Sequence, residues 1–179
     1  MNIRLIAGRY GGRTIDAPSN TRTHPMSERA RNAMFNKLGP VVNGAEVLDA
    51  FAGSGSIGLE ALSRGASSVV MVEKDKLAHS IIQKNIDLLG ASGAKAVRAS
   101  VASWIETNEG SQFDLIFADP PYHNVQLSTV KMLMGMLKPG GSMVLSHPGR
   151  GELPTKTGVV VVDNRSYGNA VLTFYRREE

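Results

Sequence analysis

The chain has 179 residues, which suits one well-buried domain and is short for two. Its hydrophobic fraction of 42% and charged fraction of 20% are those of an ordinary soluble globular protein. The absence of cysteine excludes disulfides, thiolate metal sites and a cysteine nucleophile. Because the sequence lacks both a secretory layout at its start and a run of about 18 apolar residues, we expect a cytoplasmic protein outside the membrane.

The net charge of +4 is unevenly distributed. Residues 1–40 contain seven basic and two acidic side chains, a net charge of +5, so the remaining 139 residues sum to −1. A basic leading segment on a neutral body favours a polyanionic partner such as nucleic acid, although an ordinary solvated surface would give the same count.

The first 40 residues predict a small hairpin and one helix. Residues 3–7 and 10–15 are predicted to be two short strands joined by a glycine-rich turn. Ser27 is positioned to cap a helix that runs to Leu38, where Gly39 and Pro40 supply a stop signal.

From Gly44 onward, apolar strands alternate with helices. The predicted strands are 46–51, 69–73, 94–99, 113–118, one from 142, 159–162 and 170–175. The predicted helices are about 57–63, 75–89, a brief one through Trp104, and 126–137. This alternation indicates a mostly parallel sheet covered by helices on both faces, in which ligands bind beyond the carboxyl ends of the strands.

A glycine loop follows the first strand of this alternating region. Residues 53–58 match G-x-G-x-x-G, and Glu73 follows Gly53 by twenty residues, a pattern that suits a dinucleotide site. Asp49, four residues before Gly53, favours another cofactor, because an acid there repels a pyrophosphate and attracts an ammonium. S-adenosylmethionine carries an ammonium and no phosphate. The alternative for Asp49 is a carboxylate that only caps the loop.

The next two strand ends offer groups for an adenosine. Glu73 can accept hydrogen bonds from both hydroxyls of a ribose, which serves NAD and S-adenosylmethionine alike. The backbone at Lys74 would flank the adenine. Ser100 could meet an adenine edge, or could serve only as a helix cap.

The most specific feature is Asp119-Pro120-Pro121-Tyr122, which follows the apolar strand 113–118. The two prolines fix the backbone and remove donors, so the cluster presents carbonyl oxygens and a carboxylate, the complement of an amino group. Tyr122 supplies a face on which a planar base can stack. A turn without function is the alternative for this composition.

The four histidines show no metal spacing, and we predict no metal site. They are His24, His79, His123 and His147. His123 could line the site beside the acceptor cluster or lie in a solvated loop, and Trp104 is predicted to be a core residue.

Together these motifs resemble the class I amino-methyltransferases, and most closely the RsmD family of bacterial 16S rRNA guanine-N2 methyltransferases. The match covers nearly the whole chain. It comprises Ala7-Gly8-x-x-Gly-Gly-Arg13, Ser27-Glu-Arg-Ala-Arg31, Phe51-Ala-Gly-Ser-Gly-Ser-Ile-Gly-Leu-Glu-Ala-Leu-Ser-Arg-Gly65 and Asp119-Pro-Pro-Tyr122. For the family assignment the glycine-loop segment is highly specific, whereas the acceptor cluster alone is shared with adenine-N6 DNA methyltransferases.

The resemblance implies an α/β fold of Rossmann-like class I methyltransferase type, with a mostly parallel seven-stranded sheet, one strand reversed, and an N-terminal β-hairpin. It implies S-adenosylmethionine as the cofactor and transfer of its methyl group to N2 of a guanine in 16S rRNA, at position 966. The implied catalytic residues are Asp119, Pro120 and Tyr122, and the implied cofactor residues are Asp49, Phe51, Gly53, Gly55, Glu73, Lys74 and Ser100.

The expected organisation is a basic RNA-contacting extension over residues 1–40 and a methyltransferase domain over residues 41–179. The expected RNA contacts are Arg4, Arg9, Arg13, Arg22 and Arg29. We expect a monomer whose partner is 16S rRNA or the small ribosomal subunit, with no membrane partner.

Three segments depart from the family pattern. His24-Pro25-Met26 stands where members carry Arg-Pro-Thr, Ser100 stands where Asp or Asn is commoner, and Ser146-His147-Pro148 stands where acidic residues often follow the fifth strand.

Three rival interpretations remain from the sequence, and a fourth is excluded. An adenine-N6 methyltransferase acting on DNA or RNA would share the site, although the DNA enzymes usually carry a large recognition insertion that this chain lacks. An NAD-dependent oxidoreductase matches the glycines but explains neither Asp49 nor the acceptor cluster. A base-carbon methyltransferase that needs cysteine is excluded by composition. The non-enzyme alternative is an inactive RNA-binding relative, against which the intact Asp119 and Tyr122 argue.

Overall fold

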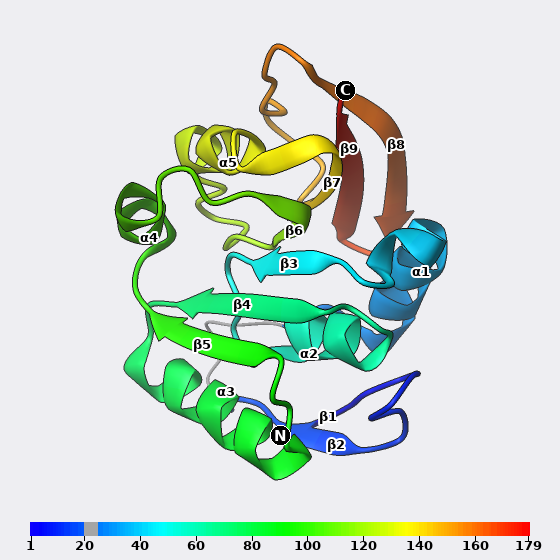
Figure 1. Ribbon diagram of the computed structural model, residues 1–179. Coiled ribbons are helices and arrows are strands. Elements are labelled where there is room, and N and C mark those ends of the chain that lie inside the picture. The colour runs from blue at the N-terminus through cyan, green and yellow to red at the C-terminus, as the bar shows by residue number, and fades with distance from the viewer. Residues whose placement is uncertain (20–24) are drawn as a thin grey trace.

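The computed structural model describes residues 1–19 and 25–179, so Arg22 and His24 lie outside the described residues. Seven strands form one sheet in the order β5-β4-β3-β6-β7-β9-β8 (Figure 1). The strands are β3 (Glu46–Asp49), β4 (Ser68–Glu73), β5 (Ala94–Arg98), β6 (Phe113–Ala118), β7 (Leu137–His147), β8 (Val159–Tyr167) and β9 (Ala170–Arg177). The first five are parallel to one another, and β9 runs antiparallel to both β7 and β8. The predicted sheet with one reversed strand is confirmed.

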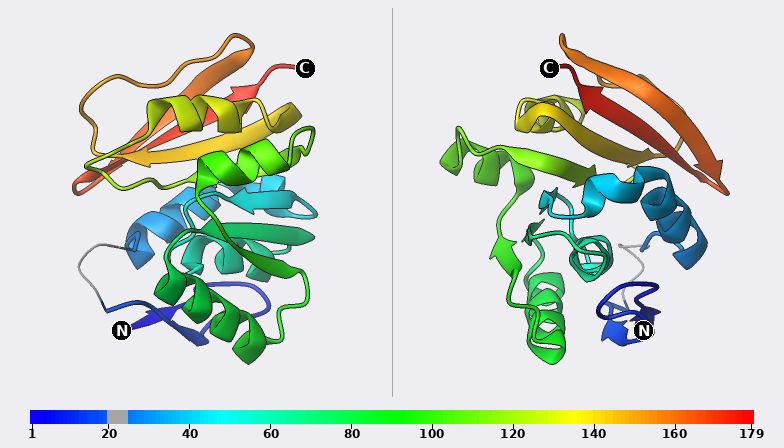
Figure 2. Two further views of the ribbon diagram at one scale, coloured as in Figure 1. Left: turned by 90° about the vertical axis from the view of Figure 1, so that its left-hand side faces the viewer. Right: turned by 45° about the vertical axis from the view of Figure 1, so that its right-hand side comes forward.

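Helices cover both faces of this sheet, because successive side chains of each buried strand point to opposite sides. Val47 belongs to one apolar cluster and its neighbour Leu48 to the other. The first cluster lies under α1 (Glu28–Leu38), α2 (Ser56–Ser63) and α3 (Lys76–Leu89), and the second under α4 (Val101–Thr107) and α5 (Leu127–Met134). Figure 2 shows the two helical layers with the sheet between them.

The start of α1 and the ends of α1 and α3 follow the predicted signals. The Ser27 hydroxyl accepts the Ala30 N–H at the start of α1, and a short 3-10 helix, η1 (Gly39–Val42), follows this helix. Gly90 ends α3 in the left-handed conformation, at φ 62°.

Two boundaries in the second half differ from the prediction. The helix predicted over 126–137 ends at Met134, and β7 begins at Leu137 with an irregular register before Ser142. Strand β8 continues past 162 to Tyr167, because it pairs with β9 along its whole length. Its polar second half lies at the sheet edge and carries no apolar alternation that would predict a strand.

The N-terminal hairpin, β1 (Asn2–Arg4) and β2 (Thr14–Asp16), packs on α2 and α3. At its turn, Gly8 approaches so closely that an added Cβ would lie 1.9 Å from the Ser63 carbonyl oxygen, and the Arg9 N–H donates to that oxygen at 2.8 Å. Since Leu5 and Ile15 are buried in the same cluster as α2, the hairpin shares one core with the methyltransferase fold. The expected boundary at residue 40 therefore marks a predicted RNA-contacting role for residues 1–40. It does not separate two hydrophobic cores.

Glu60 of α2 holds the hairpin and α1 to the sheet. Its carboxylate is fully buried and accepts the backbone N–H groups of Ile6 at 2.8 Å and Ala7 at 3.1 Å. It also pairs with Arg64 at 2.8 Å and with the buried Arg31 at 3.5 Å. A second guanidinium nitrogen of Arg31 donates to the Arg4 carbonyl. One buried acid thus contacts four groups from three segments, through three hydrogen bonds and the ion pair with Arg31.

We expect Glu60→Ala to destabilise the fold by about 3–5 kcal/mol, because it leaves Arg31 buried without its counter-charge. The measurement is the free energy of unfolding in urea, with Glu106→Ala on the exposed side of α4 as the control for loss of a carboxylate. A change no larger than that of the control would contradict the role assigned to Glu60.

Candidate active site

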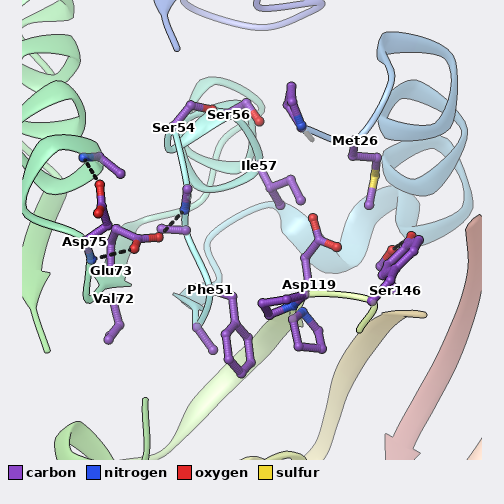
Figure 3. Close-up of a pocket in the computed structure, with 18 of the residues that line it drawn as sticks. Met26, Phe51, Ser54, Ser56, Ile57, Val72, Glu73, Asp75, Asp119 and Ser146 are labelled. Carbon is purple, nitrogen blue, oxygen red and sulfur yellow. Dashed lines mark hydrogen bonds between the residues drawn. The ribbon is translucent and has the colours of Figure 1, made fainter. Parts of the chain in front are cut away.

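A cavity of about 1010 Å³ opens beyond the carboxyl ends of the parallel strands, where the sequence predicts a ligand site. Its walls come from the segments that follow β3, β4, β5 and β6. Figure 3 shows Glu73 and Asp75 on one side, Asp119 and Ser146 on the other, and Phe51 between them. The predicted groups from four separate strand ends therefore share one cavity.

The glycine loop and Glu73 form one half of the cavity. The Gly53 N–H donates to Glu73 Oε1 at 2.9 Å, and the Asp75 N–H donates to Glu73 Oε2 at 2.8 Å. These bonds fix the carboxylate between two loops, and each oxygen keeps a free lone pair for a ligand hydroxyl. Gly53 reaches this position with φ 58°, in the left-handed region that favours glycine.

The remaining predicted cofactor residues divide between the wall and the layer beneath it. Phe51, Lys74 and Ser100 line the cavity. Ser100 also caps α4 by accepting the Ser103 N–H at 3.2 Å. Gly55 is buried behind the wall as the cap of α2, where an added Cβ would lie 3.3 Å from Met71 Sδ.

Asp49 lies beneath the loop and does not line the cavity. Its side chain is fully buried, and Oδ2 accepts the Gly58 N–H at 2.9 Å. Oδ1 has no hydrogen-bond partner among the described residues. Burial raises the pKa of Asp49 to about 7, opposed by the Gly58 bond and reinforced by the charges of Asp119 and Glu73. The loop-holding alternative weighed from the sequence is observed, and a direct contact with a ligand ammonium stays a prediction.

The acceptor cluster forms the other half of the cavity. Asp119 is half-buried on the wall, with Pro120, Pro121 and Tyr122 beside it. Burial raises the pKa of Asp119 to about 6, and a hydrogen bond from Ser146 opposes this shift. The Tyr122 hydroxyl lies 2.6 Å from Ser146 Oγ, so the end of the ring is held in place.

Four further residues line the cavity near this cluster. They are Met26, Ser146, Tyr167 and Asn169. From the sequence, Met26 and Ser146 stand out only as departures from a family pattern, and Tyr167 and Asn169 are not predicted as site residues. The available signal was the Tyr167-Gly168-Asn169 segment, a hairpin turn between the last two strands.

The basic residues of the N-terminal segment differ in their surroundings. Arg4 pairs with Glu28, the Arg9 guanidinium lies 5.8 Å from the centre of the Tyr10 ring, and Arg13 donates to the Leu88 carbonyl at 3.0 Å. Arg29 is exposed in the first turn of α1, next to the cavity wall.

The hairpin turn lies at the opposite end of the sheet from the cavity. Arg9 and Arg13 contact the last residues of α2 and α3, and both helices run back from the cavity toward the amino ends of the strands. Arg31, which also adds to the basic count, is buried against Glu60. The charge count from the sequence therefore overstated the positive surface near the site.

Among the residues that the structure describes, no group of three or more His, Cys, Asp or Glu side chains could hold a metal ion. Within the same residues, no helix has both the length and the apolar character needed to cross a bilayer.

The fold and the cavity define a class I methyltransferase. A family model described as "Conserved hypothetical protein 95" matches residues 3–176. "Ribosomal RNA small subunit methyltransferase D" of Escherichia coli (strain K12) is 36% identical over 132 residues, 73% of this chain and 66% of that protein. "Putative rRNA methyltransferase YlbH" of Bacillus subtilis (strain 168) is 32% identical over 182 residues, 98% of this chain and 99% of that protein.

A solved structure gives the same family as these sequence relatives. The structure titled "Putative methyltransferase yhhF from Escherichia coli" superposes with a TM-score of 0.90 at 31% identity and covers 99% of both chains. The chain belongs to the RsmD family of methyltransferases.

We expect the stability of this site to depend on the charge of Asp49. Because burial raises its pKa from 3.8 to about 7, the folded state favours the protonated acid, and stability is lost as the pH rises from about 4 through 7. Asp49→Asn retains an acceptor for Gly58 and removes the titration. The variant's free energy of unfolding should therefore rise relative to the wild type across this interval. Glu106→Gln is the control, and a difference that does not change with pH would contradict the prediction.

Proposed function

We propose that this chain transfers the methyl group of S-adenosylmethionine to the exocyclic N2 of a guanine in 16S rRNA, at position 966, as the family resemblance implies. The observation that carries the proposal is the sharing of one cavity by Glu73 and the glycine loop with Asp119 and Tyr122. The names of the E. coli and B. subtilis relatives support rRNA as the substrate. The partner would be the free rRNA or the small subunit, met by a monomer in the cytoplasm.

The described residues fit S-adenosylmethionine better than a dinucleotide. Glu73 has lone pairs free for the two hydroxyls of a ribose. Asp49 is a buried acid with an unpartnered oxygen beneath the loop, so it offers a pyrophosphate no counter-charge and repels it when ionised. When bound, S-adenosylmethionine supplies an electrophilic methyl group on a positively charged sulfur. Phe51, Lys74 and Ser100 would line the adenosine side.

Asp119 and the Pro120 carbonyl would receive the two hydrogens of the guanine amino group. The nitrogen lone pair is delocalised into the ring, so it is a poor nucleophile until these acceptors favour a pyramidal nitrogen. Formation of the N–CH3 bond would be matched by cleavage of the S–CH3 bond, with S-adenosylhomocysteine as the leaving group. The same acceptors stabilise the positive charge on nitrogen, which then loses one proton to water. Holding the amino group in line with the methyl group removes much of the remaining barrier, up to about 7–11 kcal/mol for well-aligned reactants.

Tyr122 would stack on the base, which must leave its helical stack to enter the cavity. The bond between its hydroxyl and Ser146 holds the ring in one orientation before the base arrives. The second candidate function is methylation of adenine N6, since an adenine amino group would use the same acceptors. Mass identification of the product nucleoside separates the two.

We expect Asp119→Ala to lower turnover by about 10²–10³, because one aligned acceptor is lost in a water-poor site. Asp119→Asn should retain part of the activity through its amide oxygen. Affinity for S-adenosylhomocysteine, measured by calorimetry, should not change in either variant. The assay is transfer of a labelled methyl group to small-subunit particles that lack the mark, and near-normal turnover by Asp119→Ala would remove the mechanism.

The wild-type rate should also fall as the pH drops through about 6, because a protonated Asp119 carboxyl is a weaker acceptor and no longer stabilises the positive charge that develops on the amino nitrogen. The same titration in Asp119→Asn should be flat in this interval. An acid limb of equal midpoint in both proteins would assign the titration to another group.

We also propose that Arg4, Arg9, Arg13 and Arg29 contact RNA phosphates, with Arg22 assigned the same role from the sequence alone. Neutralising Arg4, Arg9 and Arg13 together should weaken RNA binding and flatten its salt dependence by up to about 0.7–0.9 log units for each lost contact. The Arg29→Ala variant tests separately whether RNA phosphates are contacted next to the cavity. Arg176→Ala, exposed on β9, is the matched control. A salt slope equal to that of the control would argue against phosphate contacts by the hairpin.

A further inference from the structure

The cavity is also lined by two segments that lie far apart in the chain. One is the approach to α1, which contributes Met26, and the other is the β8–β9 turn, which contributes Tyr167 and Asn169. Neither segment belongs to the glycine loop or to the acceptor cluster. Both line the same cavity as Asp119 and Tyr122.

The β8–β9 turn presents its side chains in a fixed geometry. Tyr167 pairs with Ala170 across a two-residue loop. Gly168 has φ 60°, whereas Asn169 is not among the residues with positive φ, as expected for a type II′ hairpin turn with glycine first. The turn is thus tight, and glycine at 168 permits it.

An ion pair and a shared apolar cluster connect α1 to the strand that leads into this turn. Lys37, in the last turn of α1, pairs with Asp163 of β8 at 3.2 Å, and Met26 and Tyr167 both pack against the same apolar cluster. Figures 1 and 2 show the end of β8 lying beside α1 in each view. The last turn of α1 therefore contacts the middle of β8, and Met26 before the helix and Tyr167 at the end of the strand both line the cavity.

Tyr167 and Asn169 have polar groups available for a ligand. Tyr167 is half-buried, and Asn169 is exposed at the cavity. Neither side chain makes a hydrogen bond to another residue within 1–19 and 25–179, unlike Tyr122, which is bound to Ser146. An aromatic face and a primary amide in the cavity that also holds the Asp119 carboxylate form a set that can hold a planar heterocycle by stacking and by its edge.

We propose that Tyr167 and Asn169 form the outer wall of the base pocket and select guanine as its occupant. This inference rests on the proposed function. The Tyr167 ring packs against the base, and the Asn169 amide pairs with its edge. When the N2 amino group lies at Asp119, guanine presents N1–H as a donor and O6 as an acceptor, and a single amide complements both. Adenine with its amino group at Asp119 presents only the acceptor N1, so it gains less from Asn169.

The test compares Tyr167→Ala, Tyr167→Phe, Asn169→Ala and Asn169→Asp with the wild type in methyl transfer to rRNA. Tyr167→Ala should weaken RNA use by about 5- to 150-fold in kcat/KM through lost stacking, and Phe should restore most of it. Asn169→Ala should cost about three- to tenfold. Asn169→Asp should cost more, because a carboxylate would face O6. Calorimetry with S-adenosylhomocysteine should give wild-type affinity in all four variants.

Asn36→Ala, on the exposed side of α1 and away from this cavity, is the matched control. If the wild type is active and the Tyr167 and Asn169 variants have unchanged kcat/KM, these residues do not contact the base. The proposed rRNA methylation would be unaffected by that result. Losses that track weakened S-adenosylhomocysteine binding would also overturn the proposed base contacts, by assigning these residues to the cofactor side. A wild type that methylates no RNA would overturn the proposed function and the base pocket with it.

Discussion

Two carboxylates hold the connection between β3 and α2, and the cavity depends on both of them. Glu73 accepts the Gly53 N–H from the side of β4, and Asp49 accepts the Gly58 N–H from beneath. The loop can follow this path because Gly53 and Gly55 adopt positive φ and because Gly58 has no side chain to strike Met71. The loop is therefore shaped before a ligand binds, which lowers the entropic cost of ordering it.

The same arrangement concentrates negative charge at one end of the sheet. Asp49 is close enough to Asp119 and Glu73 for both to raise its pKa, and burial shifts Asp119 in the same direction. Such a site resists a phosphate and favours a cation, whose arrival would lower these pKa values again. A cationic sulfonium cofactor would thus also shift Asp119 toward the ionised form that accepts an amino group.

The sequence predicts the parts of this site that depend on periodicity and strand ends. Asp119, Glu73 and Gly53 could be placed together because parallel strands bring their carboxyl ends to one edge of the sheet. Whether a side chain at a strand end lines the cavity or lies buried beneath it could not be predicted in the same way. Asp49 also stands at a strand end, but it is buried below the cavity wall. The burial of Arg31 depends on Glu60, a partner 29 residues further along that no local pattern indicates.

The place of Tyr167 and Asn169 in the site also could not be predicted from the sequence, because it depends on contacts between distant parts of the chain. These two residues reach the cavity only because β9 enters the sheet between β7 and β8, which returns the β8–β9 turn to the carboxyl edge. The edge position of β8 and its polar second half removed the alternation that would have revealed the strand. The turn signal was present in the sequence, but its place beside α1 follows from packing and from the pair between Lys37 and Asp163.

The N-terminal segment has two parts that lie at opposite ends of the sheet. The start of α1 borders the cavity at Met26 and Ser27, whereas the hairpin turn packs at the far end of α2. Glu60 connects the two, because it binds Ile6 and Ala7 of the hairpin segment and Arg31 of α1. An RNA that contacted both the hairpin arginines and the cavity would have to span the face covered by α2. A folded RNA or a ribosomal particle offers such a span more readily than a short single strand does.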